Sequence, residues 1–216
     1  MQVVNVAEAA GLLGVSEAQV GRLISRGDIS ATRWGRSWVI PTASVHRYIN
    51  LRPERGRPFP STKAWEVLLT ASPSNLEEVR ALAISCRRRA ERFDARIVIG
   101  MLDHVRNDSR VMLSGVDSAK HFGAAVSVQP PLDFYLRKSD ADSFYKEFVP
   151  DLSSSENNCV LRILDDESID DIPHGQYVPL LVALVDLIAE GDYRSANEAF
   201  KSFEVLNGDT SSNSSG

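Results

Sequence analysis

The chain has 216 residues, of which 43% are hydrophobic and 25% are charged, with a formal net charge of −5. These values indicate a globular protein of one or two domains, and the absence of a long apolar run argues against a membrane span. The first residues, MQVVNVAEAAGLL, lack the basic start of a secretory signal peptide. Cys86 and Cys159 are far apart and match no metal-binding spacing, so we expect a cytoplasmic protein with two reduced thiols.

The charge is divided unevenly along the chain. Residues 1–110 contain 17 Lys and Arg against 11 Asp and Glu, whereas residues 111–216 contain 7 against 18. A basic first half is typical of a nucleic-acid partner, and the acidic second half suits either a basic protein partner or simple solubility.

The first helix is expected to begin after Asn5. Glu8 follows three residues later, which is the spacing of a capping box, and Gly14 predicts a tight reversal at the other end. The residues expected on its inward face are Val6, Ala9, Ala10 and Leu13.

A second helix is expected from Ser16, because Gln19 repeats the capping spacing, and Gly27 predicts its end. The expected inward residues are Val20, Leu23 and Ile24. Two short helices joined by a glycine turn form a helix-turn-helix, in which the second helix enters the major groove of DNA.

Two short strands, 32–34 and 37–40, are expected to follow as a hairpin turning at Gly35-Arg36. One of its two tryptophans, Trp34 or Trp38, is expected in the core. Pro41 ends the second strand, and Ser44 is expected to cap a last helix whose core residues are Val45, Tyr48 and Ile49.

The segments VAEAAGLLGVS, VGRLISRGDI and TRWGRSWVIP resemble the winged helix-turn-helix domain of the excisionase and MerR-type family. The resemblance implies that Gln19 and Arg22 contact bases while Arg33 and Arg36 contact phosphates. The full set of expected DNA-binding residues is Ser16, Glu17, Gln19, Arg22, Arg26, Arg33, Arg36 and Ser37. The arginines could instead form only a solvated basic face.

Two departures from the family pattern predict modest DNA affinity. Gly21 lies within the second helix, where glycine costs about 1 kcal/mol of helix propensity, and Ser37 replaces a frequent arginine. We therefore expect a homodimer or a protein partner to strengthen binding.

The fold class expected is α+β, with a winged helix-turn-helix at residues 1–51 and a larger mixed α+β domain at 62–206. Residues 52–61, which include RPERGRPFP, are expected to be a basic linker or a DNA-contacting arm. The polar tail 207–216 is expected to be disordered.

Within the larger domain, the expected strands are 111–113, 134–136 and 159–164. The expected helices are 62–69, 76–92, 117–122, 141–148, 178–188 and 193–206. The cluster Arg87-Arg88-Arg89 with Arg92 could bind phosphate or an acidic surface, but the side chains of such a run more often extend over a neighbouring helix or pair with nearby acids.

Short segments of this domain resemble abortive-infection-type antitoxins and related regulators. They are Ser114-Gly115 with Ala119, Asn158 with Leu161-Arg162, and Asp186-Leu187 with Asp192 and Arg194. The resemblance implies a DNA-binding repressor of its own operon whose C-terminal domain accompanies a nucleotidyltransferase-type toxin.

No catalytic, cofactor or metal site is expected. The four histidines have no ligand-spaced partner, and the phosphate-binding and nucleophile motifs are absent. The acidic loop containing Asp165 and Asp170 is the remaining candidate for metal or nucleotide chemistry, although adjacent loop carboxylates usually face water.

The leading hypothesis is a sequence-specific DNA-binding transcriptional regulator that serves as the autorepressing antitoxin of a toxin-antitoxin module. An excisionase-like architectural protein that bends DNA and a protein-interaction adaptor with little DNA binding are the alternatives.

Overall fold

The computed structural model describes residues 3–51, 57–129, 131–149, 157–165, 172 and 175–212. The chain divides into two compact units, Met1–Arg52 and Pro53–Gly216. The first contains a helix-turn-helix with a β-hairpin and the second mixes helices with a β-sheet, which confirms the expected fold class. Among the helices in the described ranges, none is both long and apolar enough to cross a membrane.

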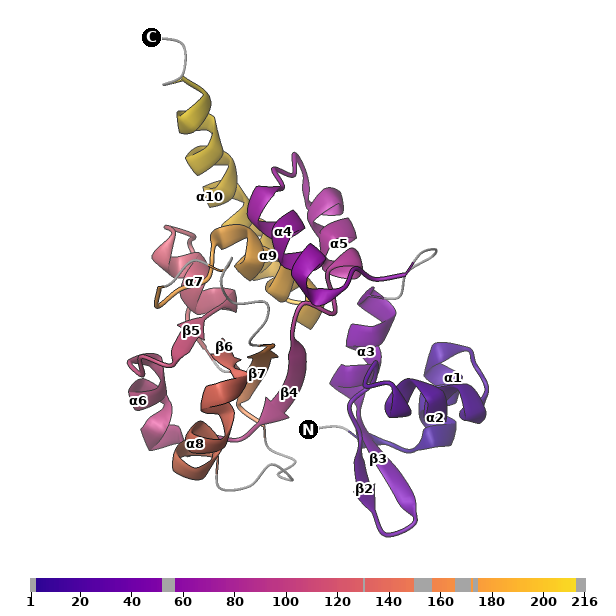
Figure 1. Ribbon diagram of the computed structural model, residues 1–216. Helices are drawn as coiled ribbons and strands as arrows, with labels where there is room; N and C mark the ends of the chain where they lie inside the picture. The colour runs from indigo at the N-terminus through magenta and orange to yellow at the C-terminus, as the bar shows by residue number, and fades with distance from the viewer. Residues whose placement is uncertain are drawn as a thin grey trace. The chain divides into compact units, whose positions relative to one another are not determined.

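The first unit follows the predicted element order and adds one strand. Its elements are β1 Val3–Val4, α1 Val6–Leu13, α2 Glu17–Ser25, β2 Thr32–Trp34, β3 Ser37–Pro41 and α3 Thr42–Leu51 (Figure 1). β3 lies between β1 and β2 and pairs antiparallel with both. β1 was not expected, because two valines before a helix cap carry no strand pattern of their own.

The ends of α1 and α2 have the predicted local chemistry. The Asn5 side chain accepts a hydrogen bond from the Glu8 amide at 2.9 Å, and the Glu8 carboxylate accepts one from the Asn5 amide at 2.8 Å. Gly14 ends α1 with φ of 64°. Gly27, with φ of 72°, follows the cap of α2, and the bond from the Asp28 amide to the Leu23 carbonyl closes the turn.

Two expectations about the last helix of this unit were wrong. α3 begins at Thr42, so Ser44 does not cap it but lies buried inside it, where its hydroxyl accepts a hydrogen bond from the Ser30 amide at 2.7 Å. The Arg47 guanidinium donates a second hydrogen bond to the Ser44 hydroxyl at 3.2 Å. Ile49 is exposed, because Val45 and Tyr48 already occupy the face that packs on the core.

We predict that Ser44→Ala destabilises the first unit by about 1 kcal/mol, because the half-buried Ser30 amide loses its acceptor. Amide hydrogen exchange measured by mass spectrometry should accelerate in peptides spanning 29–40 and stay unchanged in peptides spanning 132–137. Ser25→Ala is the matched control, since that hydroxyl is exposed and bonds only within α2 to the Gly21 carbonyl. Equal exchange in the two variants would contradict the assigned role of Ser44.

The second unit has seven helices, one 3-10 turn and four strands among its described residues. In chain order these are α4 Ser61–Thr70, α5 Leu76–Ser85, β4 Glu91–Ala95, η1 Ile99–Met101, α6 Leu102–Arg106, β5 Val111–Leu113, α7 Gly115–His121, β6 Leu132–Arg137, α8 Lys138–Phe148, β7 Cys159–Leu164, α9 Leu180–Glu190 and α10 Tyr193–Ser212. Both cysteines are free and buried within this unit.

The sheet of the second unit has the strand order β4-β7-β6-β5, in which β6 and β7 are parallel and the outer pairs are antiparallel. Alternate residues face opposite sides of the sheet. Leu132, Phe134 and Leu136 face an apolar core shared with α6 and α8 (Figure 1). Asp133 and Tyr135 therefore face the other side, where α9 lies.

α9 is the central helix of that other side, and its residues from Leu180 to Ala189 are all buried. α5, α7 and α10 pack around it. Asp186 is the one charged residue in this buried stretch and is 0% exposed. A carboxylate in such a position must be paired, because an isolated buried charge is strongly disfavoured.

Asp186 is the centre of a buried polar network. Arg89, 3% exposed, donates to the Asp186 carboxylate, Tyr135 donates to it at 2.9 Å, and Ser114 at 2.5 Å. Arg162 lies 3.1 Å from the same carboxylate and makes a two-point bond to Asp133 at 2.8 and 2.9 Å. The network joins the segment after α5 to the start of α7 and to β6, β7 and α9.

The outer part of the network carries an excess of carboxylates. Arg92 binds Glu190 at two points, at 2.7 and 2.8 Å, and contacts Asp94 at 2.7 Å. Burial raises the pKa of Asp133 to about 6, against the lowering effect of Arg162 and with a further rise from Asp186. Since this folded-state pKa lies above the unfolded value, the carboxyl stabilises the fold below about pH 4, and that contribution is lost as pH rises through 6.

Several expected boundaries in this unit were wrong. α8 begins at Lys138, three residues before its expected start. The helix expected over 76–92 ends at Ser85, because residues 91–95 pair with β7 as strand β4 and sheet pairing outweighs helix propensity. α7 begins at Gly115, two residues before the expected start. α10 continues to Ser212, so the tail is helical over 207–212; Gly208 has no positive φ that would end the helix.

Several expectations concern residues outside the described ranges. These are the linker residues 52–56, most of the acidic loop including Asp170 and His174, and the tail residues 213–216. Within the rest of the linker, the Phe59 amide bonds to the Ser85 carbonyl at 2.9 Å, and α4 begins at Ser61. Asp165 is exposed and pairs with Lys138 at 3.4 Å.

Candidate nucleic-acid interface

One side of α2 gathers three of the expected DNA-binding residues. Gln19, Arg22 and Arg26 are separated by three and four residues, so their side chains lie on the same side of the helix. Both arginines are exposed and Gln19 is half-buried. On the adjoining side of α2, Val20 and Leu23 anchor the helix to the core. The packing therefore presents an amide and two guanidinium groups to solvent from a fixed helix.

The structure separates the other expected residues of α2 from this group. Glu17 precedes Arg22 by five residues, which places it roughly 140° around the helix axis. Ser16 is the cap of α2, and its hydroxyl accepts a hydrogen bond from the Gln19 amide at 3.2 Å.

Within the group itself, Arg26 forms an ion pair with Asp28 at 2.8 Å. Arg22 is thus the arginine of α2 best placed for an external phosphate or base.

The hairpin of β2 and β3 is the wing of this unit. Its register pairs Trp34 with Ser37 and Arg33 with Trp38, and Gly35 adopts φ of 59° in the turn between them. The Arg33 guanidinium lies over the Trp38 ring, 5.9 Å from its centroid. Arg33, Arg36 and Ser37 are all exposed. The wing thus carries two solvent-facing guanidinium groups, of which one is held by an aromatic ring.

The structure decides between the two wing tryptophans. Trp38 packs against the core of the first unit, whereas Trp34 is 79% exposed. The sequence indicated that one of them belongs to the core but gave no means of choosing. The choice follows from the hairpin register, since Trp38 has the same orientation along β3 as buried Ile40.

The arginine run after α5 does not extend this interface. Arg89 and Arg92 are held by the internal acids described above, so the expectation that such a run pairs with nearby carboxylates holds for both. The Arg87 side chain bonds to the Ile84 carbonyl at 2.8 Å. Arg89 and Arg92 therefore serve the inside of the second unit, whereas Arg88 is exposed.

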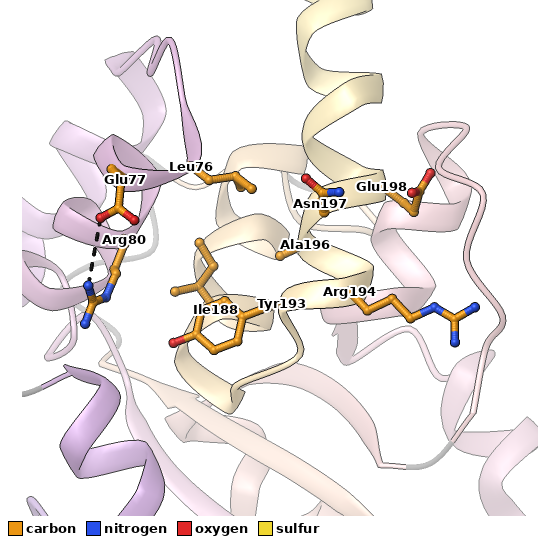
Figure 2. Close-up of a pocket in the computed structure, with 9 residues that line it drawn as sticks. All are labelled: Leu76, Glu77, Arg80, Ile188, Tyr193, Arg194, Ala196, Asn197 and Glu198. Atoms are coloured by element: carbon orange, nitrogen blue, oxygen red, sulfur yellow. Dashed lines mark ion pairs between the residues drawn. The ribbon is translucent and has the colours of Figure 1, made fainter.

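The second unit contains a pocket of about 390 Å³ between α5, α9 and α10 (Figure 2). Ile188 and Ala196 are its buried apolar residues, and Leu76 points across it from α5 toward α10. On one rim, Glu77 and Arg80 form an ion pair at 3.8 Å. The remaining lining residues are Tyr193, Arg194, Asn197 and Glu198. This lining suits contact with an apolar side chain.

A second hollow, of about 630 Å³, lies beside α7. Asp117 is at its edge and pairs with Arg106 at 3.0 Å, and burial raises the pKa of this carboxyl. His121 stacks on Tyr177 with ring centroids 4.1 Å apart. No group of three or more potential metal ligands occurs among the residues whose positions are described.

The short segments that resemble antitoxins contribute to the interior of the second unit. Ser114, Arg162 and Asp186 meet in the buried network. Asn158 bonds to the backbone of Ile97 at 2.7 and 2.9 Å. The Asp192 side chain accepts a hydrogen bond from the Ser195 amide at 3.0 Å, at the start of α10. Most of these residues define the fold, whereas Arg194 is exposed near the start of α10.

Comparison with known proteins identifies the first unit. A family model described as a helix-turn-helix domain matches residues 3–52. No curated protein and no solved structure matches the chain. The N-terminal unit is therefore a helix-turn-helix domain, a class that binds DNA. The match covers the first unit alone.

Proposed function

We propose that the protein is a sequence-specific DNA-binding transcriptional regulator without catalytic activity. The observation that carries this proposal is the side of α2 formed by Gln19, Arg22 and Arg26, on a domain matched as a helix-turn-helix. An amide can bond adenine at two points and a guanidinium can bond guanine at two points in the major groove. The wing arginines Arg33 and Arg36 add contacts to phosphates.

A homodimer fits this surface better than a monomer. Asp28 partly neutralises Arg26, which leaves Arg22, Arg33 and Arg36 as the main cationic contacts of one chain. Helix-turn-helix dimers bind two half-sites about one helical turn apart, which doubles the number of phosphate contacts. Dimerisation thus offsets a weak single interface.

We predict that affinity for a duplex selected from a random pool falls steeply with salt. The two phosphate contacts of Arg33 and Arg36 give a log–log slope of about −2 for one chain, and a dimer on two half-sites gives about −4. Fluorescence anisotropy between 50 and 300 mM KCl measures the slope, and native mass spectrometry counts the chains bound. A pool that yields no preferred sequence would refute the proposal of sequence-specific regulation.

We further propose that the regulator is an antitoxin that represses its own operon. Two observations support this: the antitoxin-like segments, and the charge of the second unit, which has 18 Lys and Arg against 26 Asp and Glu. Its acidic surface suits a basic partner, here a nucleotidyltransferase-type toxin. The apolar pocket between α5 and α10 is a candidate contact for that partner.

The adjacent gene tests the antitoxin role directly. Its product, expressed alone, should arrest growth, and co-expression of the full chain should restore growth. Arg22→Ala/Arg36→Ala should restore growth equally, since those residues belong to the DNA-binding unit. An adjacent gene whose product has no effect on growth would exclude this role while leaving DNA regulation intact.

A further inference from the structure

Trp34 is the most exposed of the large hydrophobic side chains described, at 79%. Tryptophan is a large, mainly apolar residue that is usually well buried, so this exposure is unfavourable unless the ring has a partner. The exposure is fixed by the register of the hairpin. Trp34 pairs with Ser37 at the last rung before the turn, and the ring cannot reach the core side that Trp38 occupies.

The surroundings of Trp34 suit a polyanion. Arg33 and Arg36 flank it in sequence, and both are exposed. Residues 29–51 contain no Asp or Glu, so no carboxylate of this segment competes for the two guanidinium groups. Arg33 lies on the other face of the hairpin, over Trp38, so the wing carries an exposed apolar ring on one face and a guanidinium group on the other. An apolar ring on a hairpin that also carries exposed cations matches DNA, in which stacked apolar bases lie between charged phosphate strands.

The geometry of duplex DNA limits where the ring can go. In the proposed complex, α2 occupies the major groove and the wing arginines lie at the adjacent phosphate strand. Each phosphate strand borders the major groove on one side and the minor groove on the other. A side chain at the wing tip that passes the phosphates therefore reaches the minor groove.

We propose that Trp34 is an apolar wedge that enters the minor groove beside the α2 site and unstacks one base step. This inference rests on the proposed DNA-binding function. Inserted apolar side chains kink a duplex by about 20–90° toward the major groove. The wing thereby bends the DNA and prefers pyrimidine–purine steps, which unstack easily. Both effects add to the base contacts made by α2.

Trp34→Ala should weaken binding to the selected duplex by about 10- to 100-fold, as expected for the loss of a buried aromatic anchor. Trp34→Phe keeps a ring and should recover most of this loss. The salt slope should stay unchanged in both variants, because no charge is removed. Since the side chain is exposed, circular dichroism melting should show that both variants fold like the unmodified protein.

The decisive measurement places 2-aminopurine at successive positions of the selected duplex. Its emission rises when it unstacks, so the unmodified protein and Trp34→Phe should raise it at one step, and Trp34→Ala should not. Fluorescence energy transfer between the duplex ends should report bending by the unmodified protein and by Trp34→Phe, and no bending by Trp34→Ala. Trp34→Ala binding within twofold, or an affinity loss without unstacking, would overturn the wedge. A duplex bound by no variant would instead overturn the proposed function itself.

Discussion

Asp186→Ala is expected to lower the unfolding free energy of the second unit by about 3–5 kcal/mol, a large part of the stability of a typical domain. The substitution removes the carboxylate shared by Arg89, Ser114 and Tyr135. Arg89 then remains buried with its charge uncompensated. Urea unfolding followed by far-ultraviolet circular dichroism should show a midpoint lower by about 2 M for this unit.

Two further variants separate charge from packing in this network. Asp186→Asn keeps the shape of the side chain and an oxygen acceptor. Its free energy of unfolding should therefore lie between those of the unmodified protein and Asp186→Ala. Glu204→Ala is the control for removing an acid, because Glu204 is exposed on α10. A midpoint for Asp186→Ala equal to that of Glu204→Ala would show that the network does not stabilise the unit.

Arg22→Ala/Arg36→Ala is expected to reduce affinity for the selected duplex by at least 100-fold at 100 mM salt. The double substitution removes a base contact from α2 and a phosphate contact from the wing, so the salt slope should also become less steep by about 1 per chain. Fluorescence anisotropy titrations at several KCl concentrations measure both quantities. The fold should be retained, because both side chains are exposed.

Arg80→Ala is the matched control for the loss of a surface arginine. Its guanidinium is nearly half exposed, and it belongs to the second unit, where it pairs weakly with Glu77 at 3.8 Å. Its affinity and salt slope should match those of the unmodified protein. Comparable losses in Arg80→Ala and the double variant would mean that binding depends on total charge, and the proposed interface would then be wrong.

The first unit could be predicted from sequence in most respects because its signals are local. A capping residue such as Asn5, or a glycine that must adopt positive φ such as Gly14, determines structure within a few residues. The errors came where a distant contact decides. Ser44 resembles a helix cap in sequence, but its hydroxyl is used by Ser30, 14 residues away.

The second unit was harder to predict because its main interactions join remote segments. Arg89 and Asp186 are 97 residues apart, and nothing near Arg89 in the sequence shows that it is internal. The arginine run alone fits a surface and an interior equally well. At the DNA interface, residue types and spacing indicated the arginines, but the exposure of Trp34 required the register of the hairpin.

The strand order β4-β7-β6-β5 also has a consequence for synthesis. β7 is the last strand made and lies between β4 and β6, so neither can complete its pairing until about three quarters of the chain has been translated. The first unit needs only its own 52 residues. At roughly 5–20 residues per second, it has seconds in which to fold on the ribosome before the rest of the protein can. A nascent chain is thus able to present a finished wing and α2 while its second unit still lacks a sheet.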